Sequence, residues 1–131
     1  MIGLDTNVLL RYLMQDDPVQ SSRATELIEG RLTEDNPGFL SIVAVAEIAW
    51  VLKRAYRLTD AQIVAALERM VEADVLVIEN TQEVITATAL LKAGRGAFAD
   101  ALIGARGAKA GCARTATFDK GALRLPGFAP V

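Results

Sequence analysis

The sequence of 131 residues contains no histidine, a single cysteine and no long uncharged segment. The missing histidine excludes histidine-based ribonuclease chemistry and histidine-ligated zinc, and Cys112 alone makes neither a zinc site nor an internal disulfide. The longest stretch without a charge, residues 36–46, is far too short to span a membrane. Any hydrolysis by this chain would therefore depend on carboxylates, a bound metal ion, or both.

Other absences bear on location and domain organisation. No signal peptide is expected, because Asp5 interrupts the N-terminus before an apolar region can form. The low cysteine content fits a reducing compartment, so we expect a cytoplasmic protein. The length suits one domain with its own core, and neither a linker nor an internal repeat is visible. We therefore predict a single domain over residues 1–131.

The net charge of −2 conceals an uneven distribution. Residues 1–91 hold 7 basic and 14 acidic side chains, whereas residues 92–131 hold 7 basic and 2 acidic ones. The basic C-terminal part is either a solubilising surface or a surface that binds a polyanion.

Short apolar segments alternate with longer amphipathic ones along the chain. Strands are predicted at residues 2–4, 39–41, 75–78 and 113–118, and helices at 7–14, from Pro18 to about Gly30, at 42–52, after Thr59, from Asn80 and Glu83, and at 99–110. Capping patterns support two of the helices: Asp17 with Gln20, and Thr59 with Gln62. The alternation predicts an α/β fold with a mainly parallel sheet and helices on both faces.

Two acidic residues follow predicted strands directly. Ligands bind at the carboxyl ends of the strands in parallel sheets, and Asp5 and Asp119 lie at such ends. Each also has a structural interpretation: Asp5 could cap the following helix, and Asp119 could be a turn residue before Lys120 and Gly121.

Two further acids stand in apolar surroundings. Glu47 and Ser41 are the only polar residues between Phe39 and Leu52, and a buried carboxylate is costly unless it is paired or binds a metal. A buried salt bridge, for example to Arg54, is the alternative for Glu47. Asp100 lies between apolar triplets and could instead be a helix N-cap.

If the four carboxylates converge, their repulsion becomes severe. Two carboxylates about 5 Å apart repel by roughly 3 kcal/mol at an effective dielectric constant near 20. Such a cluster is expected to raise some pKa values or to recruit cations, and an all-oxygen site suits Mg²⁺ or Mn²⁺. A divalent metal ion can activate water against a phosphodiester without any histidine.

The sequence resembles PIN-domain proteins over essentially its whole length. The resemblance rests on Ile2-Gly3-Leu4-Asp5-Thr6-Asn7, the helix with Glu47, Phe98-Ala99-Asp100-Ala101, and Thr117-Phe118-Asp119 in this order. The length is similar to that of the VapC toxins of bacterial toxin–antitoxin pairs. The resemblance implies a three-layer α/β/α PIN-like fold and Mg²⁺- or Mn²⁺-dependent endoribonuclease activity.

The resemblance also implies roles for individual residues. Asp5 and Asp100 match the main metal ligands, and Glu47 and Asp119 match the supporting acids. Thr6, Asn7 and Thr117 match positions that support these acids, and Arg95 is a candidate contact to a substrate phosphate, with a solvated loop arginine as the alternative.

The family further implies partners, namely an RNA substrate, a VapB-like antitoxin and a second copy of the chain in a homodimer; no membrane is implied. Candidate antitoxin contacts are Tyr12, Leu13, Trp50, Leu52 and Tyr56, although ordinary core packing is the favoured interpretation for any single one of them. Two other functions compete with the ribonuclease. One is an aspartyl phosphotransfer domain, disfavoured because Asn7 stands where a second aspartate is needed. The other is a catalytically silent PIN-like module that binds RNA or protein.

Overall fold

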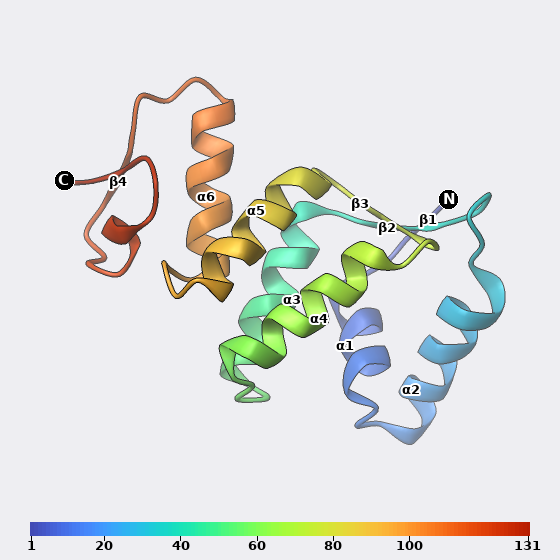
Figure 1. The fold of residues 1–131 in the computed structure, drawn as a ribbon. Coiled ribbons are helices and arrows are strands. Elements are labelled where there is room, and N and C mark those ends of the chain that lie inside the picture. Colours follow the sequence, from blue (N-terminus) through green and yellow to red (C-terminus); the bar gives the residue numbers. More distant parts are fainter. The chain divides into compact units, whose positions relative to one another are not determined.

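The computed structural model describes residues 1–131, which form two compact units, Met1–Thr81 and Gln82–Val131. Figure 1 follows the elements along the chain. The first unit contains β1 (Ile2–Gly3), α1 (Thr6–Met14), α2 (Pro18–Thr25), the π-helix η1 (Glu26–Arg31), β2 (Gly38–Leu40), α3 (Ile42–Arg54), α4 (Asp60–Glu72) and β3 (Leu76–Ile78). The second contains nearly all of α5 (Thr81–Lys92), followed by α6 (Phe98–Lys109), β4 (Thr115–Thr117), the 3-10 helix η2 (Ala122–Arg124) and β5 (Phe128–Pro130).

The sheet of the first unit is wholly parallel, with strand order β1-β2-β3. Its central strand begins at Gly38, where a Cβ atom would lie only 2.6 Å from the side chain of Leu4 and 2.8 Å from that of Leu32. Glycine therefore lets these two leucines cover the start of β2. Beyond β1, the Leu4 N–H continues the pairing with a 2.9 Å bond to the carbonyl of Phe39, which brings the chain to Asp5 at the carboxyl end of the strand.

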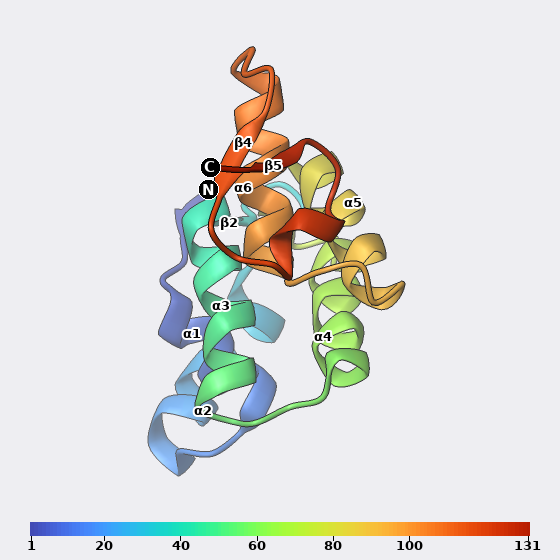
Figure 2. The same cartoon turned by 90° about the vertical axis from the view of Figure 1, so that its left-hand side faces the viewer.

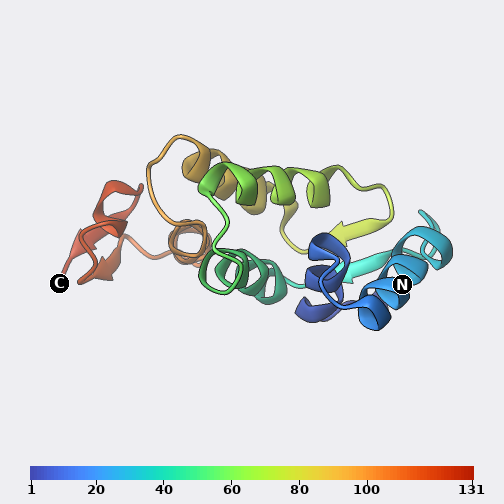
Figure 3. The same ribbon diagram turned by 90° about the horizontal axis from the view of Figure 1, so that it is seen from below.

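Helices connect these strands and bury their apolar faces. Helix α1 packs against α2 and α3, and α4 packs against α3 and β3 (Figures 1 and 3). The core of this unit includes the fully buried side chains Leu9, Leu40, Val45, Ile48, Leu52 and Leu67. The predicted helix over residues 42–52 is confirmed as α3. It buries one of its faces and leaves the other exposed.

The two predicted capping patterns differ in outcome. The capping box of Thr59 and Gln62 is confirmed. The Gln62 N–H donates a 3.2 Å bond to the Thr59 hydroxyl, and the Thr59 N–H donates a 2.9 Å bond to Gln62 Oε1. Asp17 caps α2 as predicted, but the reciprocal role of Gln20 is wrong. The Gln20 side chain instead accepts a 2.8 Å bond from Arg11 Nε, because α1 packs alongside α2 and offers a charged donor.

The second unit joins α6 to a small parallel sheet of β4 and β5 (Figure 2). Gly104 lets α6 approach Phe128 closely, since a Cβ there would lie 2.6 Å from the ring. Helices α5 and α6 are tied by Glu83, whose carboxylate lies 3.5 Å from both Arg106 and Lys109.

The predicted α/β class with mainly parallel strands is confirmed, since every strand pair is parallel. The last predicted strand is shorter than expected, at Thr115–Thr117. The predicted helix from Pro18 to about Gly30 is present as α2 followed by the π-helix η1, whereas η2 and β5 were not predicted. No helix has the length and apolar character needed to cross a membrane.

Candidate active site

Asp5 lies where β1 passes into α1. Its extended backbone makes it the N-cap of the helix, and one carboxylate oxygen accepts a 2.8 Å bond from the Thr6 N–H. The capping alternative is therefore observed. Because this bond uses one oxygen and the side chain is exposed, the second oxygen is available to a ligand.

Glu47 lies on α3 and requires a correction. The expectation that it is buried is wrong: the residue is exposed, and no salt bridge to Arg54 forms. It shares the exposed face of the helix with Val43 and Trp50, which are 73% and 57% exposed. An apolar sequence around an acid suggested burial, but α3 turns only one of its two apolar faces inward.

Asp100 and Asp119 interact within the second unit. Asp100 lies in the first turn of α6 and is half-buried, and the N-cap is Ala97, so the N-cap alternative for Asp100 is wrong. Burial raises the pKa of the Asp100 carboxyl above its ordinary value, and the negative charge of Asp119 raises it further. The structure thus places these two carboxylates near each other without neutralising either.

Asp119 is exposed and held by its own loop. Its N–H donates a 3.0 Å bond to the Thr117 hydroxyl, and its Oδ1 accepts a 2.8 Å bond from the Gly121 N–H. The turn interpretation is therefore observed as well. As with Asp5, a backbone N–H fixes one oxygen of the carboxylate and leaves the other free.

The remaining predicted site residues are placed as follows. Thr6 is buried and Asn7 is exposed, both in the first turn of α1. Arg95 is exposed, and its guanidinium donates a 3.2 Å bond to the carbonyl of Arg124. This bond holds the arginine within the second unit, which also contains Asp100.

Sequence reasoning missed one acid at the same edge of the sheet as Asp5. Glu79 directly follows β3, and its Oε1 accepts a 2.8 Å bond from the Ile42 N–H at the start of α3. The signal was present, because Glu79 follows a strand just as Asp5 and Asp119 do. Its bond to the α3 backbone gives it a structural role.

The four predicted acids fall into two pairs by unit. Asp5 and Glu47 belong to the first unit and Asp100 and Asp119 to the second, and within each unit no three acidic or cysteine side chains come together as metal ligands. None of the four forms an ion pair with lysine or arginine. Carboxylate oxygens are the ligand type that hard divalent cations prefer, but neither unit gathers enough of them by itself to form a metal site.

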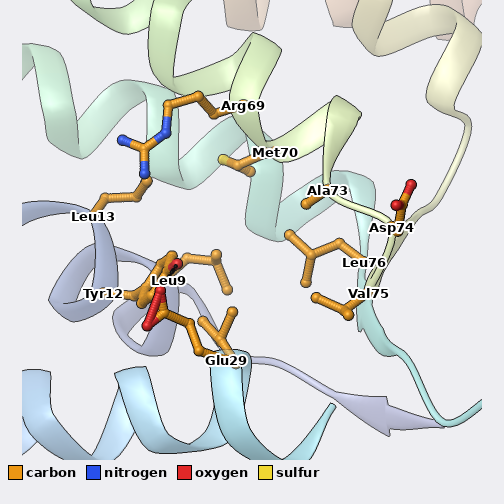
Figure 4. Close-up of a pocket in the computed structure, with 11 residues that line it drawn as sticks. Leu9, Tyr12, Leu13, Glu29, Arg69, Met70, Ala73, Asp74, Val75 and Leu76 are labelled. Carbon is orange, nitrogen blue, oxygen red and sulfur yellow. Dashed lines mark hydrogen bonds between the residues drawn. The ribbon is translucent and has the colours of Figure 1, made fainter. Parts of the chain in front are cut away.

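Two hollows open on the first unit. The larger, of about 440 Å³, is mainly apolar and lies between α1, η1, the end of α4 and the start of β3 (Figure 4). Tyr12 and Leu13 line it, and the Tyr12 hydroxyl bonds to Glu29 at its edge. The smaller hollow, of about 240 Å³, lies between α1 and α2.

The five candidate antitoxin contacts differ in accessibility. Leu52 is fully buried, so its expected role as a contact is wrong, and it is a core residue. Trp50 is exposed, and Tyr12, Leu13 and Tyr56 are half-buried.

Comparison with known proteins gives one match. The family model described as PIN domain matches residues 2–127, which includes parts of both units. With the helices and parallel strands, this match fits the predicted three-layer α/β/α PIN-like fold. No curated protein and no solved structure matches the chain.

Proposed function

We propose that this chain, which belongs to the PIN-domain family, is a Mg²⁺- or Mn²⁺-dependent endoribonuclease. PIN domains are commonly metal-dependent nucleases that act on RNA. The observation that carries the proposal is the state of the four acids, none of which is paired with a basic side chain although the chain has 14 of them. The charge of Asp119 helps to raise the pKa of Asp100, so a cation bound beside these two carboxylates would relieve their repulsion.

Asp5 and Asp100 would hold the metal ion, and Glu47 and Asp119 would complete its surroundings. A bound divalent ion neutralises the phosphodiester and lowers the pKa of water, which supplies the nucleophile. The protein contributes oriented carboxylates: a backbone N–H fixes one oxygen of Asp5 and one of Asp119. Thr117 supports the second of these through its bond to the Asp119 N–H.

The test is cleavage of single-stranded RNA by the purified chain. We expect cleavage with Mg²⁺ or Mn²⁺ and none after chelation. The Asp5→Asn variant keeps a good N-cap residue, so its helix should stay intact. Its activity should nevertheless fall by at least about 100-fold, since even the outer partners of metal ligands cost 10–100-fold when they are removed.

A matched control is Asp35→Asn, which removes an exposed acid outside the proposed site. It should cleave RNA like the wild type. Equal cleavage by the Asp5→Asn variant would show that the activity comes from another site or a contaminant. RNA binding without cleavage under any metal would instead support the catalytically silent module.

We further propose that the chain is the VapC-like toxin of a toxin–antitoxin pair and forms a homodimer. The apolar hollow lined by Tyr12 and Leu13 supports a VapB-like partner, as does the exposed face of α3 that carries Trp50. Expression alone should arrest growth, and co-expression of the product of a small neighbouring gene should relieve the arrest. Light scattering of the purified chain would measure its oligomeric state.

A further inference from the structure

The smaller hollow of the first unit has a lining unlike that of the larger one. Four of its side chains are polar and none is acidic: Asn7 and Arg11 from α1, and Gln20 and Arg23 from α2. Apolar residues form the rest of the lining: Val8 from α1, Ala24 from α2 and Leu27 from η1. Two arginines and two amides in one cavity make a site rich in hydrogen-bond donors.

One of the arginines is held in a fixed position. Arg11 Nη1 lies 3.1 and 3.0 Å from the two carboxylate oxygens of Asp16, and Arg11 Nε donates a 2.8 Å bond to Gln20 Oε1. The Tyr56 hydroxyl also bonds to Asp16 and so fixes the carboxylate. These bonds leave Nη2 of Arg11 and the amide nitrogen of Gln20 as donors.

The second arginine differs from the first in its pairing. Asp16 forms an ion pair with Arg11, and the carboxylate of Asp17, which caps α2, adds a second negative charge near that arginine. Arg23 is exposed and forms no ion pair. The hollow therefore combines one guanidinium that has no ion-pair partner with several further hydrogen-bond donors.

The surrounding charge makes this feature unusual. Residues 1–81 carry 7 basic and 13 acidic side chains, so most of the first unit repels a polyanion. The hollow is also close to Asp5 in the chain. Asn7 lies two residues after Asp5, and from Asn7 to Arg11 the hollow follows α1 for about 6 Å.

We propose that this hollow binds a phosphate group of the RNA backbone and so positions the strand beside Asp5. The inference rests on the proposed ribonuclease function and deepens it, because it assigns a substrate-positioning role to Arg23. A guanidinium and amide donors match the charge and the acceptor oxygens of a phosphodiester. Such a contact adds affinity without reading the base sequence.

The test measures binding of a labelled single-stranded RNA to the full chain, with a chelator present to prevent cleavage. Arg23→Gln should weaken binding about tenfold, similarly for different RNA sequences. The slope of log affinity against log salt should become shallower by about 0.7, the value for one phosphate contact on a single strand. Arg23→Lys should keep most of the salt slope.

Arg31→Gln is the matched control, because Arg31 is an exposed arginine of the same unit that lies outside both hollows. It should bind RNA like the wild type. Thermal melting should show that both variants are folded. A phosphate titration followed by NMR should shift the backbone signals of Asn7, Gln20 and Arg23.

The outcomes separate this inference from the ribonuclease itself. If the wild type cleaves RNA but Arg23→Gln binds it with unchanged affinity and salt slope, the phosphate site is refuted and the ribonuclease stands. If the wild type neither cleaves nor binds RNA, the ribonuclease is refuted and the RNA assignment falls with it. If an acidic peptide shifts the signals of the hollow and RNA does not, the hollow is a protein-binding site and the proposal is overturned.

Discussion

Replacing Asp100 by asparagine should stabilise the metal-free protein. Asparagine keeps the shape of the side chain and removes its charge. Burial and the charge of Asp119 both raise the pKa of the Asp100 carboxyl, which means that the ionised form opposes folding at neutral pH. The variant should therefore melt at a higher temperature than the wild type.

The magnitude follows from the environment of the pair. Burial is the larger cause of the raised pKa of Asp100, and the charge of Asp119 adds to it. For scale, any two charges about 5 Å apart repel by about 0.8 kcal/mol in water and about 3 kcal/mol at an effective dielectric constant near 20. Asp119 is exposed and Asp100 half-buried, so solvent screening brings the effect to about 1 kcal/mol. For a chain of this length, that corresponds to a rise in Tm of about 3–5 °C.

The dependence on pH gives the reasoning a second check. The pKa of Asp100 is raised in the folded state, so its destabilising charge is present above that raised value and is lost as the pH falls towards the unfolded value of about 3.9. The Tm difference between the Asp100→Asn variant and the wild type should be largest at pH 7 and should shrink towards pH 4. Differential scanning calorimetry in the presence of a chelator measures both.

With a divalent metal ion bound, the wild type should melt at a higher temperature than the Asp100→Asn variant. A divalent ion at about 100 times its Kd stabilises a protein by about 2.7 kcal/mol, and the variant should lose most of this gain. Asp74→Asn, at an exposed acid outside the proposed site, is the control and should respond to metal like the wild type. An Asp100→Asn variant that melts below the wild type at pH 7 without metal would refute the reasoning, because Asp100 would then be stabilising the fold.

Two further predictions concern packing and a hydrogen-bond cluster. Gly96→Ala should lower the free energy of unfolding by about 1–3 kcal/mol, because a Cβ there would lie 2.6 Å from the side chain of Leu125. Denaturant unfolding measures this change. The control is Gly30→Ala, which should not be destabilising because a Cβ at Gly30 would have nothing within 4 Å. Tyr56→Phe should lower the Tm slightly at pH 7. The hydrogen bond from Tyr56 is the main cause that lowers the pKa of Asp16, so this stabilisation is present above about pH 3.9 and is lost as the pH falls through the lowered value. The Tm difference between Tyr56→Phe and the wild type should therefore vanish in acid, and a difference that persists there would contradict this account.

Much of the fold could be predicted because local signals carry it. The box of Thr59 and Gln62 defines a helix start from four residues alone, and the β-branched segment before Glu79 forms a strand as expected. The failures occur where a distant neighbour decides the outcome. Gln20 bonds to Arg11 on the adjacent helix instead of capping its own, a choice that no local pattern contains.

The candidate site also contains residues whose setting is local and could be predicted, and a residue whose setting depends on distant packing. Asp5 and Asp119 could be located from their places after strands, and the capping and turn bonds that orient them are local. The exposure of Glu47 could not be predicted, because α3 is apolar on both faces and only its packing selects the buried one.

The parallel pairing of the strands has a consequence for the growing chain. No two strands can join as a hairpin, so each pair must wait until the helices between its members have been made. The segment that ends in Asp5 is made before its pairing strand, Gly38–Leu40, which follows more than thirty residues later. A nascent chain cut short before residue 38 would leave the segment before this aspartate unpaired, so Asp5 reaches its final setting only after β2 has been made.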